Sequence, residues 1–309
     1  MTSLWRVPAG AGLAALSLAT GGLLAAPTLA GPPAWAAPGP VLATGSPAPS
    51  PTPSPSPTPA RSSWVQVMNL PSHDAGRSSR TVLVYRPAVP DSATLPVLYL
   101  LHGQYGRPQD PFGSGMRSIL DRLFAQGWPP FVVAVPDGGS AARTDDEWGN
   151  AADHADSLET FVTHDVLVAV EGSMRRDRAH RAVAGFSMGG YAAAFNAGLR
   201  PSLYGQMVSL AGYFRVDDPE GVWGGSSVTQ DQHYPLRHPH WLDHTRVLLL
   251  DTAQDNDPVT AGQLQAFQRT LAGAGHAPGA RVTDGGHDWS WVSAQWPLIV
   301  RFLTQGWGH

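Results

Sequence analysis

The sequence Gly-Phe-Ser-Met-Gly at residues 185–189 constrains this chain more than any other stretch. A short apolar run, 182–184, enters it and a run of small, helix-forming residues leaves it. A serine on so sharp a strand-to-helix turn has a strained backbone, and a side chain at either glycine would collide. In this setting the pattern predicts that Ser187 is a nucleophile held above a sheet. The bare five-residue pattern also fits an ordinary turn with a small polar residue at its apex.

The first 60 residues are expected to lie outside the folded domain. Arg6 precedes an Ala-, Leu- and Gly-rich stretch, and Ala34-Trp-Ala at 34–36 resembles a small-x-small cleavage site, so residues 1–36 indicate a secretory signal peptide. An uncleaved signal anchor is the alternative, because the apolar stretch is marginally long enough to span a membrane. Residues 37–60 form a Pro/Ser/Thr-rich linker that favours polyproline II. We therefore expect a secreted or extracellular domain that the linker holds away from a surface or the cell envelope.

Residues 61–309 are enough for one α/β domain with a large core. The chain has no cysteine, which excludes disulfides, lipoprotein attachment through cysteine and cysteine-based catalysis. Its formal net charge is −4 and it has no basic run, so nucleic acid is not an expected partner.

Apolar runs alternate with helical patterns along this domain. Strands are expected at 64–70 and 81–86, as an antiparallel hairpin, and then at 96–101, 131–135, 182–184, 206–210, 247–250 and, most weakly, 280–283. Helices are expected at 158–174, where Leu158 and Met174 end one apolar face, at 264–271 and at 289–303. This order predicts a single α/β domain with a mostly parallel, doubly wound sheet.

Two poorly periodic stretches, 137–156 and 215–245, follow strand ends. Ligands of doubly wound sheets bind beyond the carboxyl ends of the strands. We therefore expect both stretches to wall a substrate pocket that includes Trp148 and Trp223.

An acyl-transferring serine needs a base, an acid that orients the base, and donors for the oxyanion. His287, between the last strand and the last helix, is the candidate base. The loop 251–258 offers three aspartates as the acid; Asp257 is preferred by position and Asp255 is the alternative. The backbone N–H groups of Met188 and Gln104 are the expected oxyanion donors.

Other histidines are assigned weaker roles. His102 precedes a glycine turn and is expected to be structural. His233, His238, His240 and His244 could suggest zinc, but their loop contains proline and lacks a helical i, i+4 metal motif. No metal site and no cofactor is therefore predicted.

Taken together, these stretches resemble the "putative esterase" family of α/β-hydrolases, which includes S-formylglutathione hydrolase (esterase D), feruloyl and enterochelin esterases, and antigen 85-type mycolyltransferases. The matching stretches occur in the family's order over nearly all of residues 80 to 305 and are 97–103, 133–137, 158–162, 184–190, 255–258 and 285–289.

The resemblance implies an α/β-hydrolase fold, Ser187 as nucleophile, His287 as base, an acid in the aspartate loop, and oxyanion donors at Gln104 and Met188. The family usually has a glycine three residues before the acid. Aligning Gln254 with that glycine favours Asp257, but the altered loop leaves Asp255 open.

The sequence thus predicts an exported serine carboxylic-ester hydrolase that works through a Ser-His-Asp triad and an acyl-enzyme. Its expected substrate is a small-molecule, glycan or lipid ester. One alternative is an acyltransferase that moves an acyl group to a sugar or lipid alcohol, as mycolyltransferases do. Another is a non-catalytic domain that binds polysaccharide or an envelope component through its tryptophan-bearing loops.

Overall fold

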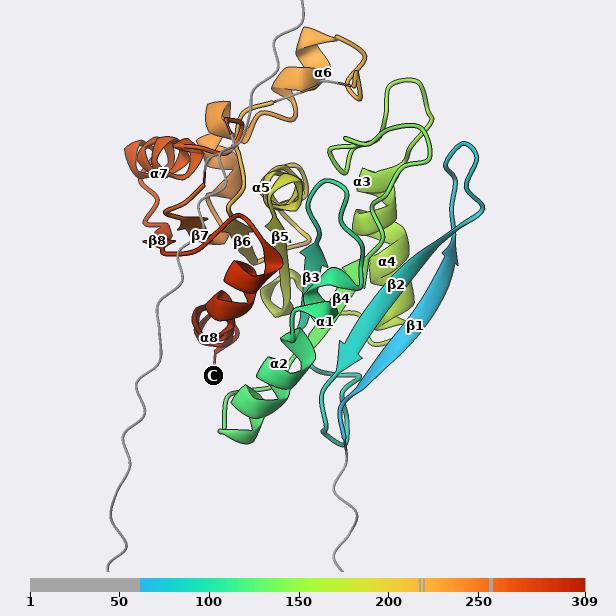
Figure 1. The fold of residues 1–309 in the computed structure, drawn as a ribbon, viewed down its shortest axis with the longest axis vertical. Coiled ribbons are helices and arrows are strands. Elements are labelled where there is room, and N and C mark those ends of the chain that lie inside the picture. The colour runs from blue at the N-terminus through green and yellow to red at the C-terminus, as the bar shows by residue number, and fades with distance from the viewer. Residues whose placement is uncertain (1–61, 217, 219, 256–257, 309) are drawn as a thin grey trace, which may run out of the picture. The chain divides into compact units, whose positions relative to one another are not determined.

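A single eight-stranded sheet with helices on both faces organises the domain (Figure 1). The computed structural model describes residues 62–216, 218, 220–255 and 258–308. The strands, in chain order, are β1 (Trp64–Pro71), β2 (Ser79–Arg86), β3 (Val97–Leu101), β4 (Val132–Pro136), β5 (Arg181–Phe186), β6 (Gln206–Leu210), β7 (Arg246–Thr252) and β8 (Gly279–Thr283). Their order in the sheet is β1-β2-β4-β3-β5-β6-β7-β8.

Strand direction follows the sequence prediction. β1 pairs antiparallel with β2, and β2 antiparallel with β4, while every pairing from β4 through β8 is parallel. The opening hairpin, the mostly parallel sheet and even the weakly predicted strand β8 are therefore confirmed. Parallel pairing brings the carboxyl ends of β3 to β8 to one edge, which is where ligands of such sheets bind.

The helices are α1 (Asp110–Gly113), α2 (Met116–Ala125), α3 (Leu158–Thr160), α4 (Val166–Glu171), α5 (Met188–Leu199), α6 (Ser227–Asp231), α7 (Gln263–Gly273) and α8 (Trp289–Gly306). Side chains of α4, α5 and α7 join one core cluster and those of α2 and α8 join the other. β3 serves both layers, because Tyr99 and Leu101 belong to the first cluster and Leu98 and Leu100 to the second.

The helix predicted over 158–174 is present from 158 to 171, with a local π-helical turn in its interior, and the prediction is wrong at its end. A π-helical turn, Phe161–Asp165, separates α3 from α4, and α4 ends at Glu171. Gly172 follows with a φ of 56°, which ends the helix, and Met174 beyond it is 48% exposed. The apolar face predicted from spacing therefore stops before Met174.

None of the helices in the described part of the chain has the length and apolar character needed to cross a membrane. The signal peptide and linker expected at 1–36 and 37–60 lie outside the described residues.

Candidate active site

Ser187 sits on a strained turn between β5 and α5. Its backbone has φ 55° and ψ −121°, a region that residues with side chains rarely occupy. The turn is held from both sides, because the Ser187 N–H donates to the Leu210 carbonyl at 2.9 Å and the Ser187 carbonyl accepts from the Gly190 N–H at 2.8 Å. This is the geometry expected of a nucleophile elbow.

The glycines at 185 and 189 permit close approach of backbone to backbone. A Cβ on Gly185 would lie 2.0 Å from the carbonyl oxygen of Gly189, and a Cβ on Gly189 would lie 2.4 Å from the carbonyl oxygen of Leu101. The elbow is therefore packed directly on the carboxyl end of β3, where the next turn begins.

Ser187 lines a small cavity of about 50 Å³ together with Gln104, Met188, Asp145 and Tyr213, among others. Met188 is the first residue of α5, so its N–H precedes the intrahelical hydrogen bonds. Within the described residues, the backbone N–H groups of Gln104 and Met188 donate to no protein acceptor. Both are thus available to an oxyanion formed beside Ser187.

His102 stabilises the turn that carries Gln104. Its Nε2 accepts from the Gly138 N–H at 2.9 Å, so Nδ1 bears the ring proton and donates to the Gly103 carbonyl at 2.9 Å. Burial lowers the pKa of His102, which keeps the ring neutral. The indole N–H of Trp148 donates to the His102 carbonyl at 3.0 Å. These contacts support the structural role predicted for His102.

His287 lies in the loop between β8 and α8, and its ring packs on Phe186 at a centroid distance of 4.7 Å. Because Phe186 directly precedes Ser187, this contact brings the candidate base to the elbow. The His287 Nδ1 is 3.4 Å from Asp255 Oδ1, within ion-pair distance but without hydrogen-bond alignment. The Thr260 hydroxyl donates to the other oxygen of Asp255.

The three aspartates predicted as candidate acids lie at the end of β7 and in the loop that follows it. Asp251 belongs to β7 itself and is buried, and burial raises its pKa to about 6. Asp255 is the one described aspartate of this loop that contacts His287. Asp257, the acid preferred from the sequence, lies outside the described residues, so that preference stays a prediction.

A larger cavity of about 500 Å³ adjoins the elbow at Met188. It is lined by the turn after β3 and by the loop after β4, and three arginines, Arg77, Arg107 and Arg143, contribute to it. Part of the stretch 137–156 therefore lines this cavity, through Asp137, Gly139, Ser140, Arg143, Thr144 and Asp146. That the cavity holds the substrate stays a prediction.

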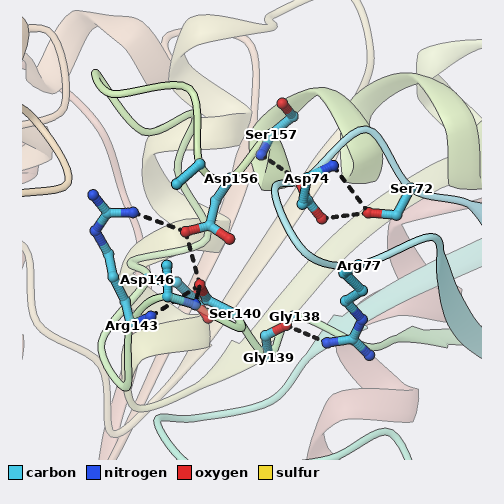
Figure 2. A network of polar contacts seen from close by, with 12 residues as sticks. Ser72, Asp74, Arg77, Gly138, Gly139, Ser140, Arg143, Asp146, Asp156 and Ser157 are labelled. Carbon is cyan, nitrogen blue, oxygen red and sulfur yellow. Dashed lines mark hydrogen bonds and ion pairs between the residues drawn. The ribbon is translucent and has the colours of Figure 1, made fainter.

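A network of ion pairs holds that wall in place (Figure 2). Arg143 contacts Asp156 at 3.0 Å, and Asp156 also accepts from the Ser140 hydroxyl at 2.8 Å. Arg77 donates to the Gly139 carbonyl (Figure 2). It also pairs with Asp137. Two of the three cavity arginines, Arg77 and Arg143, already have carboxylate partners. Arg107 is exposed and makes no ion pair among the described residues. It is therefore the cation most available to a ligand.

Acidic residues of this loop were missed by sequence reasoning, although the run of three acids at 145–147 was a signal. Asp146 lines the large cavity, and burial raises its pKa to about 7, against the hydrogen bond from the Trp148 N–H. Glu147 is fully buried, with a φ of 51°, and accepts from the Tyr213 hydroxyl. That contact ties the loop to the wall of the small cavity.

The prediction that Trp148 and Trp223 line the pocket is wrong, because both side chains are fully buried. Trp148 fills the space over Gly138, and Trp223 fills the space over Gly149 and stacks on His233 at 3.8 Å. These indoles support the pocket wall from behind.

The stretch 215–245 also does not have its predicted role, since none of its described residues lines either cavity beside Ser187. It packs over α5 instead, through the short helices Pro235–Arg237 and Pro239–Leu242.

Comparison with known proteins adds a family and a fold. The model of the family described as "Putative esterase" matches residues 73–303. A ferulic acid esterase structure superposes with a TM-score of 0.68 at 23% identity, covering 80% of this chain and 99% of that one. An S-formylglutathione hydrolase from Agrobacterium tumefaciens gives a TM-score of 0.67 at 16% identity, with 81% and 98% covered. MPT51 of Mycobacterium tuberculosis gives 0.62 at 19% identity, with 79% and 98% covered.

Proposed function

Since this chain belongs to the "Putative esterase" family of α/β-hydrolase-fold enzymes, we propose that its ester hydrolysis uses Ser187 as nucleophile and His287 as base. The observation that carries the proposal is the strained φ of 55° at Ser187, on a turn that also contacts the His287 ring through Phe186. Acyl transfer requires a serine nucleophile, an imidazole base and oxyanion donors. Here the serine is strained, the His287 ring packs on the residue before it, and two N–H donors are available.

In the proposed reaction, His287 takes the Ser187 hydroxyl proton as the oxygen attacks the ester carbonyl. The Gln104 and Met188 N–H groups stabilise the oxyanion, and the imidazolium returns the proton to the departing alcohol, which leaves an ester of Ser187. A water molecule then gives its proton to His287 and attacks this acyl-enzyme. Collapse of the second tetrahedral intermediate releases the acid and restores the serine hydroxyl.

We propose Asp255, the alternative from the sequence, as the residue that orients His287. Its carboxylate is 3.4 Å from the imidazole Nδ1 and is itself held by the Thr260 hydroxyl. A carboxylate in this place holds the tautomer in which Nε2 accepts a proton and stabilises the imidazolium that forms.

The cavity beside Met188 supports a polar or short acyl group. Its wall carries Arg107, Arg143 and Asp146, which would be poor neighbours for a long alkyl chain. Esters of aromatic acids such as ferulic acid, the acid in the description of one structural neighbour, are suitable first substrates. We therefore propose an ester of a polar or short-chain acid as the substrate. The match to the "Putative esterase" family supports hydrolysis rather than transfer to a lipid or sugar alcohol.

Labelling with a fluorophosphonate probe tests the mechanism. The folded protein should react at Ser187 and hydrolyse p-nitrophenyl acetate and methyl ferulate, and Ser187→Ala should do neither. An unlabelled, inactive but folded wild type would support the non-catalytic envelope-binding alternative. Faster acyl transfer to trehalose than to water would overturn hydrolysis in favour of the acyltransferase.

We also propose export. The support is the sequence of residues 1–36 and the linker at 37–60. Amino-terminal sequencing of protein recovered from the culture medium should begin at residue 37. Retention of the full-length chain in the membrane fraction would favour the uncleaved anchor.

A further inference from the structure

We propose that His240, Asp243 and His276 form a binding site for one divalent transition-metal ion, of which Zn²⁺ is the natural probe. One ligand atom from each of the three residues lies within 4.8 Å of the others. Two imidazoles and one carboxylate are donors that suit zinc, nickel and copper.

The spacing of the donors fits a shared ion. His276 Nε2 is 3.0 Å from Asp243 Oδ1, and His240 Nδ1 is 3.2 Å from the same oxygen. With bonds of about 2.0–2.1 Å, tetrahedral zinc places neighbouring ligand atoms about 3.3 Å apart. The two separations from Asp243 Oδ1 therefore need little adjustment. The ligand atoms of the two histidines lie within 4.8 Å of each other, and the exposed His240 side chain can move to bring its nitrogen to the same ion.

The Nε2 atom of His276 is buried and has no hydrogen-bond partner among the described residues. The His276 side chain is only 11% exposed, and its Nε2 lies beside Asp243 without making a hydrogen bond to it. Polar atoms buried without a hydrogen bond are uncommon in folded proteins, and a bound ion is one of the recognised explanations.

The site is remote from Ser187 and joins two segments. His240 and Asp243 lie just before β7, and His276 lies between α7 and β8. Both strands begin at this end of the sheet, whereas Ser187 follows the carboxyl end of β5. His276 also lines a separate cavity of about 370 Å³, together with Arg246. The Arg246 guanidinium donates to the side-chain oxygen of Gln206 and to the Phe302 carbonyl. We infer a structural ion that holds the starts of β7 and β8 together.

This inference is independent of the proposed reaction, and it is tested by metal binding to the full-length, untagged protein. Isothermal titration should give one equivalent of Zn²⁺, and Zn²⁺ should raise the melting temperature. His276→Ala and Asp243→Asn should each weaken Zn²⁺ binding at least about tenfold and abolish the thermal shift, while p-nitrophenyl acetate hydrolysis stays unchanged.

His180→Ala is the matched control. His180 is also a surface histidine, and its Nδ1 lies 2.7 Å from a single carboxylate, that of Asp177. It should bind Zn²⁺ as the wild type does. Co²⁺ should give the visible absorption of a low-coordinate site in the wild type and in this control alone. Failure of the wild type to bind Zn²⁺, or an equal loss of binding in His180→Ala, would overturn the site.

Discussion

Asp255 Oδ1 lies 3.4 Å from His287 Nδ1, although the two residues come from different loops and are separated by α7 and β8. The loops meet because β7 and β8 are parallel neighbours, so their carboxyl ends lie side by side. A second link joins the end of β7 to the His287 loop, because the Thr252 hydroxyl donates to the Gly285 carbonyl. The position of the candidate base is thus set by the sheet.

Asp255→Asn should reduce kcat by about ten-thousandfold, because an amide beside Nδ1 stabilises the wrong tautomer of His287 and does not stabilise the imidazolium. Asp257→Asn should have a much smaller effect. Steady-state hydrolysis of p-nitrophenyl acetate by the two variants measures this, with circular dichroism as the check on folding. A larger loss in Asp257→Asn would move the acid to position 257 and leave the remainder of the mechanism intact.

Gly185→Ala should prevent the elbow from forming. The new Cβ would lie 2.0 Å from the Gly189 carbonyl oxygen, a backbone atom that cannot move without displacing Ser187. We expect the free energy of unfolding to fall by more than about 3 kcal/mol and esterase activity to be lost.

Gly273→Ala is the control for that substitution. Gly273 ends α7, and nothing lies within 4 Å of its Cβ position. Activity should be unchanged and stability equal to the wild type or up to about 1 kcal/mol higher. Urea unfolding measures both variants, and similar losses in the two would show that the contact at position 185 is not the cause.

Gln104→Ala tests whether the oxyanion donor is a backbone group. The side chain is removed but the N–H is kept, so kcat/KM should fall by no more than about fivefold. Loss of an oxyanion donor itself costs about a hundredfold to a thousandfold. A loss of that size in Gln104→Ala, measured with p-nitrophenyl acetate, would assign the donor to the side-chain amide instead.

Asp146→Asn should change how stability depends on pH. Burial raises the pKa of Asp146 from 3.8 to about 7, so the folded state binds this proton more tightly than the unfolded state does. The contribution of Asp146 to stability is therefore fully present below about pH 4 and declines as pH rises toward 7. Asparagine has no charge to bury, and its side-chain oxygen can still accept from the Trp148 N–H.

The stability gain of Asp146→Asn over the wild type should be larger at about pH 8 than at about pH 5, by roughly 2–3 kcal/mol. Urea unfolding at the two pH values gives the comparison. The buried Asp251 is present in both proteins and cancels. An equal difference at both pH values would mean that Asp146 does not titrate in this range.

Local pattern was sufficient for the strands and for the elbow. Apolar runs of five residues become strands buried on both faces, such as Val97–Leu101, because a parallel sheet between two helical layers has no exposed face. The elbow follows equally from neighbours in the chain, since Gly185 and Gly189 flank Ser187 and allow its turn. The antiparallel hairpin is also local, and it was predicted.

Contacts between distant segments could not be obtained from spacing. A tryptophan in a glycine-rich loop suits a sugar-binding surface as well as a core, and only packing over Gly138 places Trp148 inside.

The amino-acid order was therefore enough to predict the strands and the strained turn at Ser187, because each depends on residues that are adjacent or on a regular period. Folding of the whole domain was needed to bring Asp255 to His287 and His276 to Asp243. Those contacts depend on which strands become neighbours and on how far each loop extends past its strand, and neither quantity is present in the local pattern.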